Sequence, residues 1–479
     1  MCGRTHLLLV LAVAGCADQT FVDDGLGYSK DAREHDVRGA DAGGGEDRSD
    51  VPAGDAPDGG LGPDAESADD GTRPELPPRV RGGGWAGARI DGRLLVVATV
   101  VGRPLGGARV VVETGTGTIS ARTDLDGAVW MVDPALRGPV VVHVFAAGQG
   151  YVSFVGIQSE QLWVEYEEAG PKAPVKVRGR VIGRELLPDW NWNTIRYGYV
   201  EAIAESVFSA PADQDQGEFR SNEVVQGALW DDFDYSLNAD ASAFRGIWAA
   251  AGLFNFDTGA TSWTAFGCVA GLSFMDGLVA PDLVLRPLHS DPLRVVVLHR
   301  PPESSSVVFA TLNFPNRGGV VLLPQVLGDA GAFLRPRLEV EAATATYGGG
   351  AQFLGPGRNR ISIKQGVSTS SVVLDDFLPL PRLSSSGRSL SVQTSSAVSL
   401  STLTIKTGTT THWQVIMLEG ILSTRLPVPP SEFSDPLRGS MSVQTETFRL
   451  EDFSSEAYSL STITPDLRLY SMAISTVTF

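Results

Sequence analysis

The sequence is poor in cysteine, in long apolar runs and in clustered basic charge. Of its 479 residues only three are Cys, at positions 2, 16 and 268, so no disulfide framework holds the fold. No apolar run approaches the roughly 18 residues that a spanning helix needs. The formal net charge is −18, whereas neutralising phosphates requires clustered Lys and Arg. We therefore expect neither a membrane-spanning helix nor a nucleic-acid partner.

The N-terminal segment 1–16 is typical of a secretion signal. Arg4 supplies a short positive stretch, Leu7 to Val13 an apolar one, and Val13-Ala14-Gly15-Cys16 closes the segment. These last four residues resemble a bacterial lipobox, in which small residues precede a Cys that becomes lipidated. The resemblance implies a lipoprotein signal peptide, an acylated Cys16 that binds a lipid membrane, and a place in the cell envelope. An ordinary signal peptide with a chance Cys is the alternative.

Most of the negative charge lies in the following segment, residues 17–78. It contains 13 Asp and 4 Glu against five Lys or Arg, a net charge of −12, and it has hardly any large apolar residue after Tyr28. Such a chain cannot bury enough apolar surface to offset its ordering entropy. The segment is predicted to be a disordered acidic linker between the lipid and the folded part.

From about Arg79 onward, short alternating runs separated by Gly, Pro, Asn and Asp predict β-strands. Residues 79–170 contain three ordered motifs. They are Gly102-Arg103-Pro104-Leu105-Gly106-Gly107-Ala108, then Thr123-Asp124-Leu125-Asp126-Gly127, then Ala147-Gly148-Gln149-Gly150-Tyr151. This order resembles the carboxypeptidase regulatory-like domain, a transthyretin-like sandwich, apart from the extra pair Gln149-Gly150. The resemblance implies a non-catalytic accessory module.

The second of these motifs is interpreted as a tight turn. Gly127 can take the positive φ that such a turn requires, and Asp124 is expected to accept hydrogen bonds from its own turn backbone. A calcium loop is the alternative, but it would need another carboxylate where Arg122 stands.

The rest of the chain is predicted to be β as well. Residues 171–289 form a second sandwich with late strands at Phe244 to Ala250 and Thr264 to Leu272, and residues 290–479 form a Ser/Thr-rich sandwich region. The predicted fold is all-β, with two or three consecutive Ig-like or transthyretin-like sandwiches after a disordered N-terminal tether.

Two sequence echoes occur in the last region. Residues 389–394 recur as 440–445, and residues 399–404 recur as 459–464. Duplication and convergent strand composition both explain them. The apolar residues Val398 and Leu400 are at even positions, whereas Leu403 and Ile405 are at odd ones. Since successive side chains of a strand point to opposite faces, a β-bulge is expected near Ser401-Thr402.

Aromatic residues gather at the start of the second sandwich. Trp190 and Trp192 share one parity, as do Tyr197 and Tyr199, so their flat rings can line one face and form a ligand-binding surface. Rings beside amide side chains suit the stacking of sugars. The alternative is that these rings cap the sandwich core.

A weak metal site is placed at Asp213 and Asp215, whose alternating carboxylates can converge on calcium. A solvated loop is the default interpretation, because Gly217 falls where a third ligand is expected. No other metal-ligand spacing and no cofactor motif is present, so no cofactor is expected.

The sequence carries no nucleophile elbow, and the contiguous side chains of His289-Ser290-Asp291 cannot form a relay. The favoured function is a membrane-anchored, surface-displayed lipoprotein that acts as a non-enzymatic envelope, adhesion or binding module. Its partners are the membrane and a glycan or another surface protein. The alternative is a carbohydrate-binding protein that uses Trp190 and Trp192, and an unrecognised hydrolase is the third hypothesis.

Overall fold

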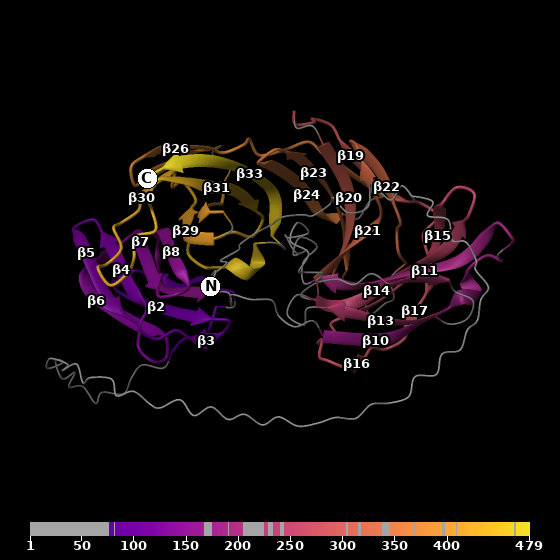
Figure 1. Ribbon diagram of the computed structural model, residues 1–479, viewed down its shortest axis with the longest axis horizontal. Coiled ribbons are helices and arrows are strands. Elements are labelled where there is room, and N and C mark those ends of the chain that lie inside the picture. Colours follow the sequence, from indigo (N-terminus) through magenta and orange to yellow (C-terminus); the bar gives the residue numbers. More distant parts are fainter. Residues whose placement is uncertain are drawn as a thin grey trace, which may run out of the picture. The chain divides into compact units, whose positions relative to one another are not determined.

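The chain folds into β-sheets, as the computed structural model shows (Figure 1). This confirms the all-β sandwich class. Among the described residues, no helix is long and apolar enough to cross a membrane. The structure describes residues 76–80, 82–166, 175–189, 191–204, 225–228, 233–239, 244–302, 305–314, 318–337, 345–367, 370–394, 398–408, 410–463 and 466–479.

One pattern of strand pairing recurs four times, and each recurrence is here named a module. Six strands of the pattern follow one another in every module, and the first three modules add a seventh. The first and fourth strands pair antiparallel and form one sheet. The other sheet contains the remaining strands in the order third, second, fifth, sixth, each paired with its neighbours. In the first three modules the seventh strand returns parallel to the first. The region predicted at 290–479 thus contains two recurrences of the pattern.

The first module begins with an additional strand, β1, and contains a short extra strand, β3. Its seven core strands are β2, β4, β5, β6, β7, β8 and β9. The bounds are β1 Gly84–Arg89, β2 Asp91–Val100, β3 Arg103–Pro104, β4 Arg109–Thr114, β5 Gly117–Arg122, β6 Ala128–Arg137, β7 Val140–Ala146, β8 Gly150–Ile157 and β9 Ser159–Tyr166.

The second module divides its seventh strand into two short pieces, β16 and β17, both parallel to β10. A short 3-10 helix, η1, follows its first strand. The bounds are β10 Val175–Ile182, η1 Arg184–Leu186, β11 Thr194–Ala204, β12 Val225–Ala228, β13 Phe233–Ala239, β14 Phe244–Asn255, β15 Ala260–Ala270, β16 Leu278–Val279, β17 Leu283–Val284 and β18 Arg286–Pro287.

The third module follows the pattern without additions. Its bounds are β19 Leu293–Val297, β20 Ser305–Phe314, β21 Gly318–Leu327, β22 Ala330–Phe333, β23 Thr346–Gly355, β24 Arg358–Val367 and β25 Ser371–Leu374.

The fourth module differs at one edge, where β26 pairs antiparallel with its first strand, β27, and takes the place of a returning seventh strand. Its bounds are β26 Arg382–Ser386, β27 Ser389–Gln393, β28 Leu400–Thr407, β29 Thr410–Leu418, β30 Ser423–Arg425, β31 Ser440–Leu450, β32 Tyr458–Ser459, η4 Leu460–Thr462 and β33 Leu467–Thr478.

Alternation of buried apolar side chains with more exposed ones along the strands builds the cores of the modules. In β4, Val110 and Val112 are fully buried, whereas Arg109 and Val111 on the other face are only partly buried. β-branched residues suit such a pleated, half-buried surface. In the second module, Val177 from one sheet and Val200 and Ile247 from the other lie in one buried cluster. Each module is therefore a two-layered sandwich.

The four-stranded sheets of the modules join edge to edge in an order that differs from chain order. β8 of the first module pairs parallel with β29 of the fourth. β33 of the fourth pairs with β24 of the third, and β21 of the third meets β11 of the second through the pair Ala204 and Gly319. The first and last modules of the chain are thus neighbours in one sheet.

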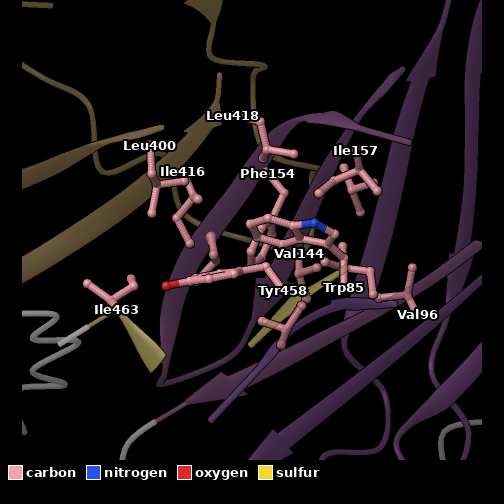
Figure 2. Close-up of a cluster of buried hydrophobic side chains, with 14 of the residues drawn as sticks. Trp85, Val96, Val144, Phe154, Ile157, Leu400, Ile416, Leu418, Tyr458 and Ile463 are labelled. Atoms are coloured by element: carbon pink, nitrogen blue, oxygen red, sulfur yellow. The ribbon is translucent and has the colours of Figure 1, made fainter. Parts of the chain in front are cut away.

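Buried side chains of the first and fourth modules form one apolar cluster (Figure 2). At its centre, the indole of Trp85 contacts the rings of Phe453 and Tyr458 and donates a hydrogen bond to the Ser454 carbonyl at 3.2 Å. The labelled members are Trp85, Val96, Val144, Phe154 and Ile157 from the first module, and Leu400, Ile416, Leu418, Tyr458 and Ile463 from the fourth.

The turn predicted at 123–127 is present. The Oδ1 atom of Asp124 accepts hydrogen bonds from the backbone nitrogens of Asp126 at 2.8 Å and Ala128 at 3.0 Å. Gly127 has φ +70°, and a Cβ there would lie 2.3 Å from the Ala98 carbonyl oxygen. The positive φ and the close approach both require glycine at this position.

Replacing the turn carboxylate, Asp124→Ala, is expected to lower the free energy of unfolding by about 1 kcal/mol, because two backbone donors lose their acceptor. Urea titration followed by circular dichroism measures the change. Asp124→Asn keeps an acceptor oxygen and is the matched control, so equal stability of the Ala and Asn variants would contradict the assigned role.

The two sequence echoes occupy non-equivalent places. Residues 389–393 are β27, the first strand of the module, whereas residues 440–450 are β31, the fifth. The other echo matches β28 with β32 and η4. The echoes therefore reflect convergent strand composition. The bulge expected near Ser401-Thr402 is wrong, because the register shifts instead between Ile405 and Lys406.

Candidate binding site: an aromatic strip

The structure brings together two of the four aromatic residues predicted to form a site. Tyr197 and Tyr199 lie on one face of β11. Trp192 is 87% exposed in the turn before β11, and no ring contact joins it to another described residue. Trp190 lies outside the described residues, as do Asp213 and Asp215 of the predicted cation site.

Strand register places further rings beside the two tyrosines. Tyr197 is opposite Gly252 of β14, and Gly252 is opposite Trp263 of β15. A bulge skips Thr264 at this point, so Trp263 faces the same side of the sheet as Tyr197. The two rings lean over the glycine to a centroid distance of 6.2 Å.

Seven rings form a continuous series of contacts on this face, which we name the aromatic strip. Successive centroids lie 5.3–6.3 Å apart, the range over which aromatic rings attract one another. The strip runs in the order Phe256, Phe254, Tyr197, Trp263, Tyr199, Trp248, Phe266.

Exposure rises along the strip from one end to the other. Trp248 and Phe266 are each 3% exposed and pack with the core of the third module, whereas Phe256 is 59% exposed. The rings between them are partly buried, and those of Tyr199 and Trp263 also pack against the core of the third module. The face is also opposite to the one that carries the second module's own core, to which Val200 and Ile247 belong. The strip therefore leads from a packed interior to the protein surface.

Gly252 is essential to this arrangement. A Cβ at this position would lie 2.1 Å from the Ser262 carbonyl oxygen, which is closer than atoms approach in proteins. A larger residue would push β14 and β15 apart at the bulge. The glycine thus lets the rings of Tyr197 and Trp263 meet above the middle strand.

The strip face carries hydroxyl groups, one carboxylate and, at its buried end, the guanidinium of Arg286 in β18, which lies opposite Phe266. The Tyr199 hydroxyl donates to the Glu201 carboxylate at 3.1 Å, and burial raises the pKa of Tyr197. No Lys or Arg occurs at the fifteen register positions of this face in β11, β14 and β15. Nearby Arg196 faces the other side and pairs with Asp189 at 3.1 Å.

Cys268 lies beside the buried end of the strip. Burial raises the pKa of its thiol to about 11, so the thiol stays protonated at neutral pH. It packs against the third module's core as a small apolar residue. Its role is therefore packing.

A serine, a histidine and a glutamate also meet in the structure, on the first module. Ser153 Oγ lies 2.7 Å from His143 Nδ1, and His143 Nε2 lies 3.4 Å from Glu113 Oε1. Trp413 Nε1 donates to Ser153 Oγ at 2.8 Å, so we assign the Ser153 hydroxyl as donor to His143 Nδ1. The hydrogen bond from His143 lowers the pKa of Glu113, although partial burial acts in the opposite direction.

The serine and the histidine of this relay are sealed inside the protein, whereas Glu113 is partly exposed. Ser153 and His143 are both fully buried, so no substrate reaches the hydroxyl. The relay joins β4, β7 and β8 to β29 and is structural. Among the described residues, no three His, Cys, Asp or Glu side chains are placed to hold a metal.

Comparison with known proteins gives no family. No family model and no curated protein matches the chain. Three solved structures illustrate the weak likenesses found. The TIE protein of Bacillus anthracis is 9% identical at a TM-score of 0.13, and the match covers 60% of this chain but only 50% of that one.

The other two structures are a Ca2+-stabilised adhesin with which an Antarctic bacterium binds ice, and two B repeats of the collagen-binding protein of Staphylococcus aureus. The adhesin is 10% identical at a TM-score of 0.15, covering 78% of this chain and 90% of that one. The repeats are 7% identical at a TM-score of 0.12, covering 68% and 74%. TM-scores this low establish no shared function.

Sequence reasoning missed the rings contributed by β14 and β15. The predicted strands ended at Ala250 and began at Thr264, whereas β14 continues to Asn255 and β15 begins at Ala260. The turn between them is short because Asn255 Oδ1 accepts from the backbone nitrogens of Asp257 and Thr258. The motif Asn-Phe-Asp-Thr-Gly at 255–259 was the available signal for this tight hairpin.

Proposed function

We propose that this protein is a lipid-anchored, non-enzymatic protein of the cell envelope that binds a ligand through the aromatic strip. The observation that carries the proposal is the gradient of exposure along the strip, from 3% at Trp248 to 59% at Phe256. Contiguous exposed apolar surface on a soluble domain marks an interaction site. The buried end holds the exposed rings in place, which reduces the entropy lost on binding.

The anchor rests on the lipobox resemblance at Val13 to Cys16 and on the acidic segment 17–78. Acyl chains on Cys16 would hold the protein at a membrane, since each buried methylene contributes about 0.8 kcal/mol. A 62-residue flexible coil has a root-mean-square reach of about 45 Å, so the modules would stand clear of the lipid headgroups.

Cys16→Ser is expected to move the protein from the membrane fraction to the soluble fraction, because the acylated side chain is lost. Immunoblots of fractionated cells measure the distribution, and metabolic labelling with a fatty-acid analogue reports acylation directly. Cys2→Ser, which alters a cysteine that leaves with the signal, is the matched control. A Cys16→Ser protein that stays with membranes would refute the anchor.

The first module is proposed to be a carboxypeptidase regulatory-like domain. Support comes from the placement of the three motifs at the ends of strands: one leads into β4, the next precedes β6, and the last leads into β8. Under this proposal the first module is an accessory part, and ligand binding falls to the second module.

The strip is tested by attachment of cells that display the protein. Trp263→Ala and Tyr197→Ala are expected to reduce attachment severalfold, because each removes a ring from the middle of the strip. Surfaces coated with neutral polysaccharide, acidic polysaccharide or casein are the targets. Trp130→Ala, which removes a partly buried Trp from the first module, is the matched control.

Equal attachment of the wild type and both strip variants to every surface would overturn the proposed function. Surface amounts are equalised by immunolabelling, and circular dichroism of the purified full chains checks folding.

A further inference from the structure

We infer that the aromatic strip binds a neutral polysaccharide by stacking pyranose rings on Tyr197, Trp263 and Phe254. This inference rests on the proposed function and names its ligand. The C–H groups on one face of a pyranose ring carry partial positive charge, and the face of an aromatic ring is negative. A series of adjacent rings therefore presents a matching surface to a chain of sugars.

The geometry of the strip suits an extended ligand. Phe254, Tyr197 and Trp263 are consecutive members, with centroids 5.8 and 6.2 Å apart. They come from three neighbouring strands, so the series crosses the sheet and continues to the exposed ring of Phe256. A single small molecule would need a closed pocket, whereas an open series of rings contacts successive units of a polymer.

Polar groups on the same face match sugar hydroxyls. Thr261 is paired in register with Phe254, which is in turn opposite Ile195. Along the same face, Tyr199 lies two register pairs further on and Glu201 lies three further on, and they contribute a hydroxyl and a carboxylate. Hydroxyls both donate and accept hydrogen bonds, as do the hydroxyls of a sugar. Rings flanked by such groups can hold both the apolar face and the polar rim of a pyranose.

The charge of the face selects a neutral chain. A sulfated or uronic-acid chain would require cations beside the stacking rings. None of the fifteen register positions of this face in β11, β14 and β15 carries Lys or Arg, and Arg286 of β18 lies opposite Phe266 at the buried end of the strip. Glu201, which lies beside Tyr199 on this face, repels anionic sugars.

The test is binding of the purified full chain, in detergent, to an array of neutral and acidic glycans. We expect binding to neutral glycans, and a loss of about tenfold in affinity in Trp263→Ala and in Tyr197→Ala, the amount that one stacked ring contributes. Trp130→Ala is expected to bind as the wild type does.

A second measurement needs no variant. Oxidation of tryptophan by N-bromosuccinimide, mapped by peptide mass spectrometry, is expected to slow at Trp263 when the bound glycan is present. Trp192 is the internal reference, because it is 87% exposed and lies outside the strip. Unchanged oxidation of Trp263 in a saturating bound glycan would overturn the assigned position.

The outcomes separate the inference from the function on which it rests. Strip-dependent attachment of cells to casein without binding of any neutral glycan would overturn the inference and leave the proposed function standing. Binding of acidic glycans in preference to neutral ones would also overturn it. Attachment that is independent of the strip on every surface would overturn both.

Discussion

Replacing Glu446 by Ala is expected to lower the free energy of unfolding by about 3–5 kcal/mol, the cost of breaking a buried hydrogen-bond network. Glu446 is fully buried in β31, and its carboxyl accepts from Thr402 Oγ1 at 2.8 Å, Tyr470 OH at 2.8 Å and Gln444 Nε2 at 3.2 Å. The Ala variant leaves these donors buried without their acceptor. Urea unfolding of the full chain measures the change, and a loss below about 1 kcal/mol would contradict this role.

The same side chain predicts a pH dependence. Burial raises the pKa of Glu446 above its ordinary value of 4.5, although the hydrogen bonds from Tyr470, Thr402 and Gln444 act in the opposite direction. The folded state therefore holds the proton more tightly than the unfolded state. This contribution to stability is fully present below pH 4.5 and is lost as the pH rises through the folded pKa.

Glu446→Gln has no such titration and keeps the size of the side chain. The difference in unfolding free energy between wild type and this variant is expected to shift in favour of the variant from pH 4.5 towards neutrality. A difference that is independent of pH would show that the carboxyl titrates alike in both states.

Trp413→Ala is expected to cost about 3–5 kcal/mol and to loosen the contact between the first and fourth modules. Trp413 is fully buried in β29, and its indole nitrogen donates a hydrogen bond to Ser153 Oγ. The centroid of its ring lies 5.3 Å from that of Tyr151 and 5.7 Å from that of Phe145. Removing the ring leaves a cavity beside the parallel pairing of β8 with β29. Hydrogen exchange is expected to increase in both strands.

Trp413→Phe separates packing from hydrogen bonding, because it keeps an apolar ring and removes the donor. A double-mutant cycle with Ser153→Ala isolates the hydrogen bond, for which we expect a coupling of about 1 kcal/mol. If Trp413→Ala changed stability without any change of exchange in β8, the proposed link between the modules would be wrong.

Local signals in the sequence predicted the strands and turns of the first module well. Asp124 and Gly127 specify their turn through a side-chain acceptor and a positive φ, both of which depend on the residues within the turn. The same local reasoning failed at Ser401-Thr402. Every residue of β28 from Leu400 to Ile405 is buried, because both faces of this strand are covered, so hydrophobic parity carries no information about a bulge.

The candidate site was only half predictable for a related reason. Tyr197 and Tyr199 are close in sequence and share a parity that identifies their face. Trp263 joins them only through the pairing of β11 with β14 and of β14 with β15, and through the skipped residue Thr264. A single sequence does not specify that register, which depends on contacts between distant segments.

The order in which the modules join has a consequence for how the protein is made. Trp413 and Ser153 are 260 residues apart in sequence, yet the strands that carry them pair edge to edge. When the chain emerges N-terminus first, the first module can complete its own sandwich, but the outer edge of β8 stays unpaired until the last module arrives. Contacts this distant slow folding, and an open strand edge is prone to aggregate. The edge of β8 therefore needs shielding while the remaining modules are synthesised, and its pairing is completed only when β29 arrives.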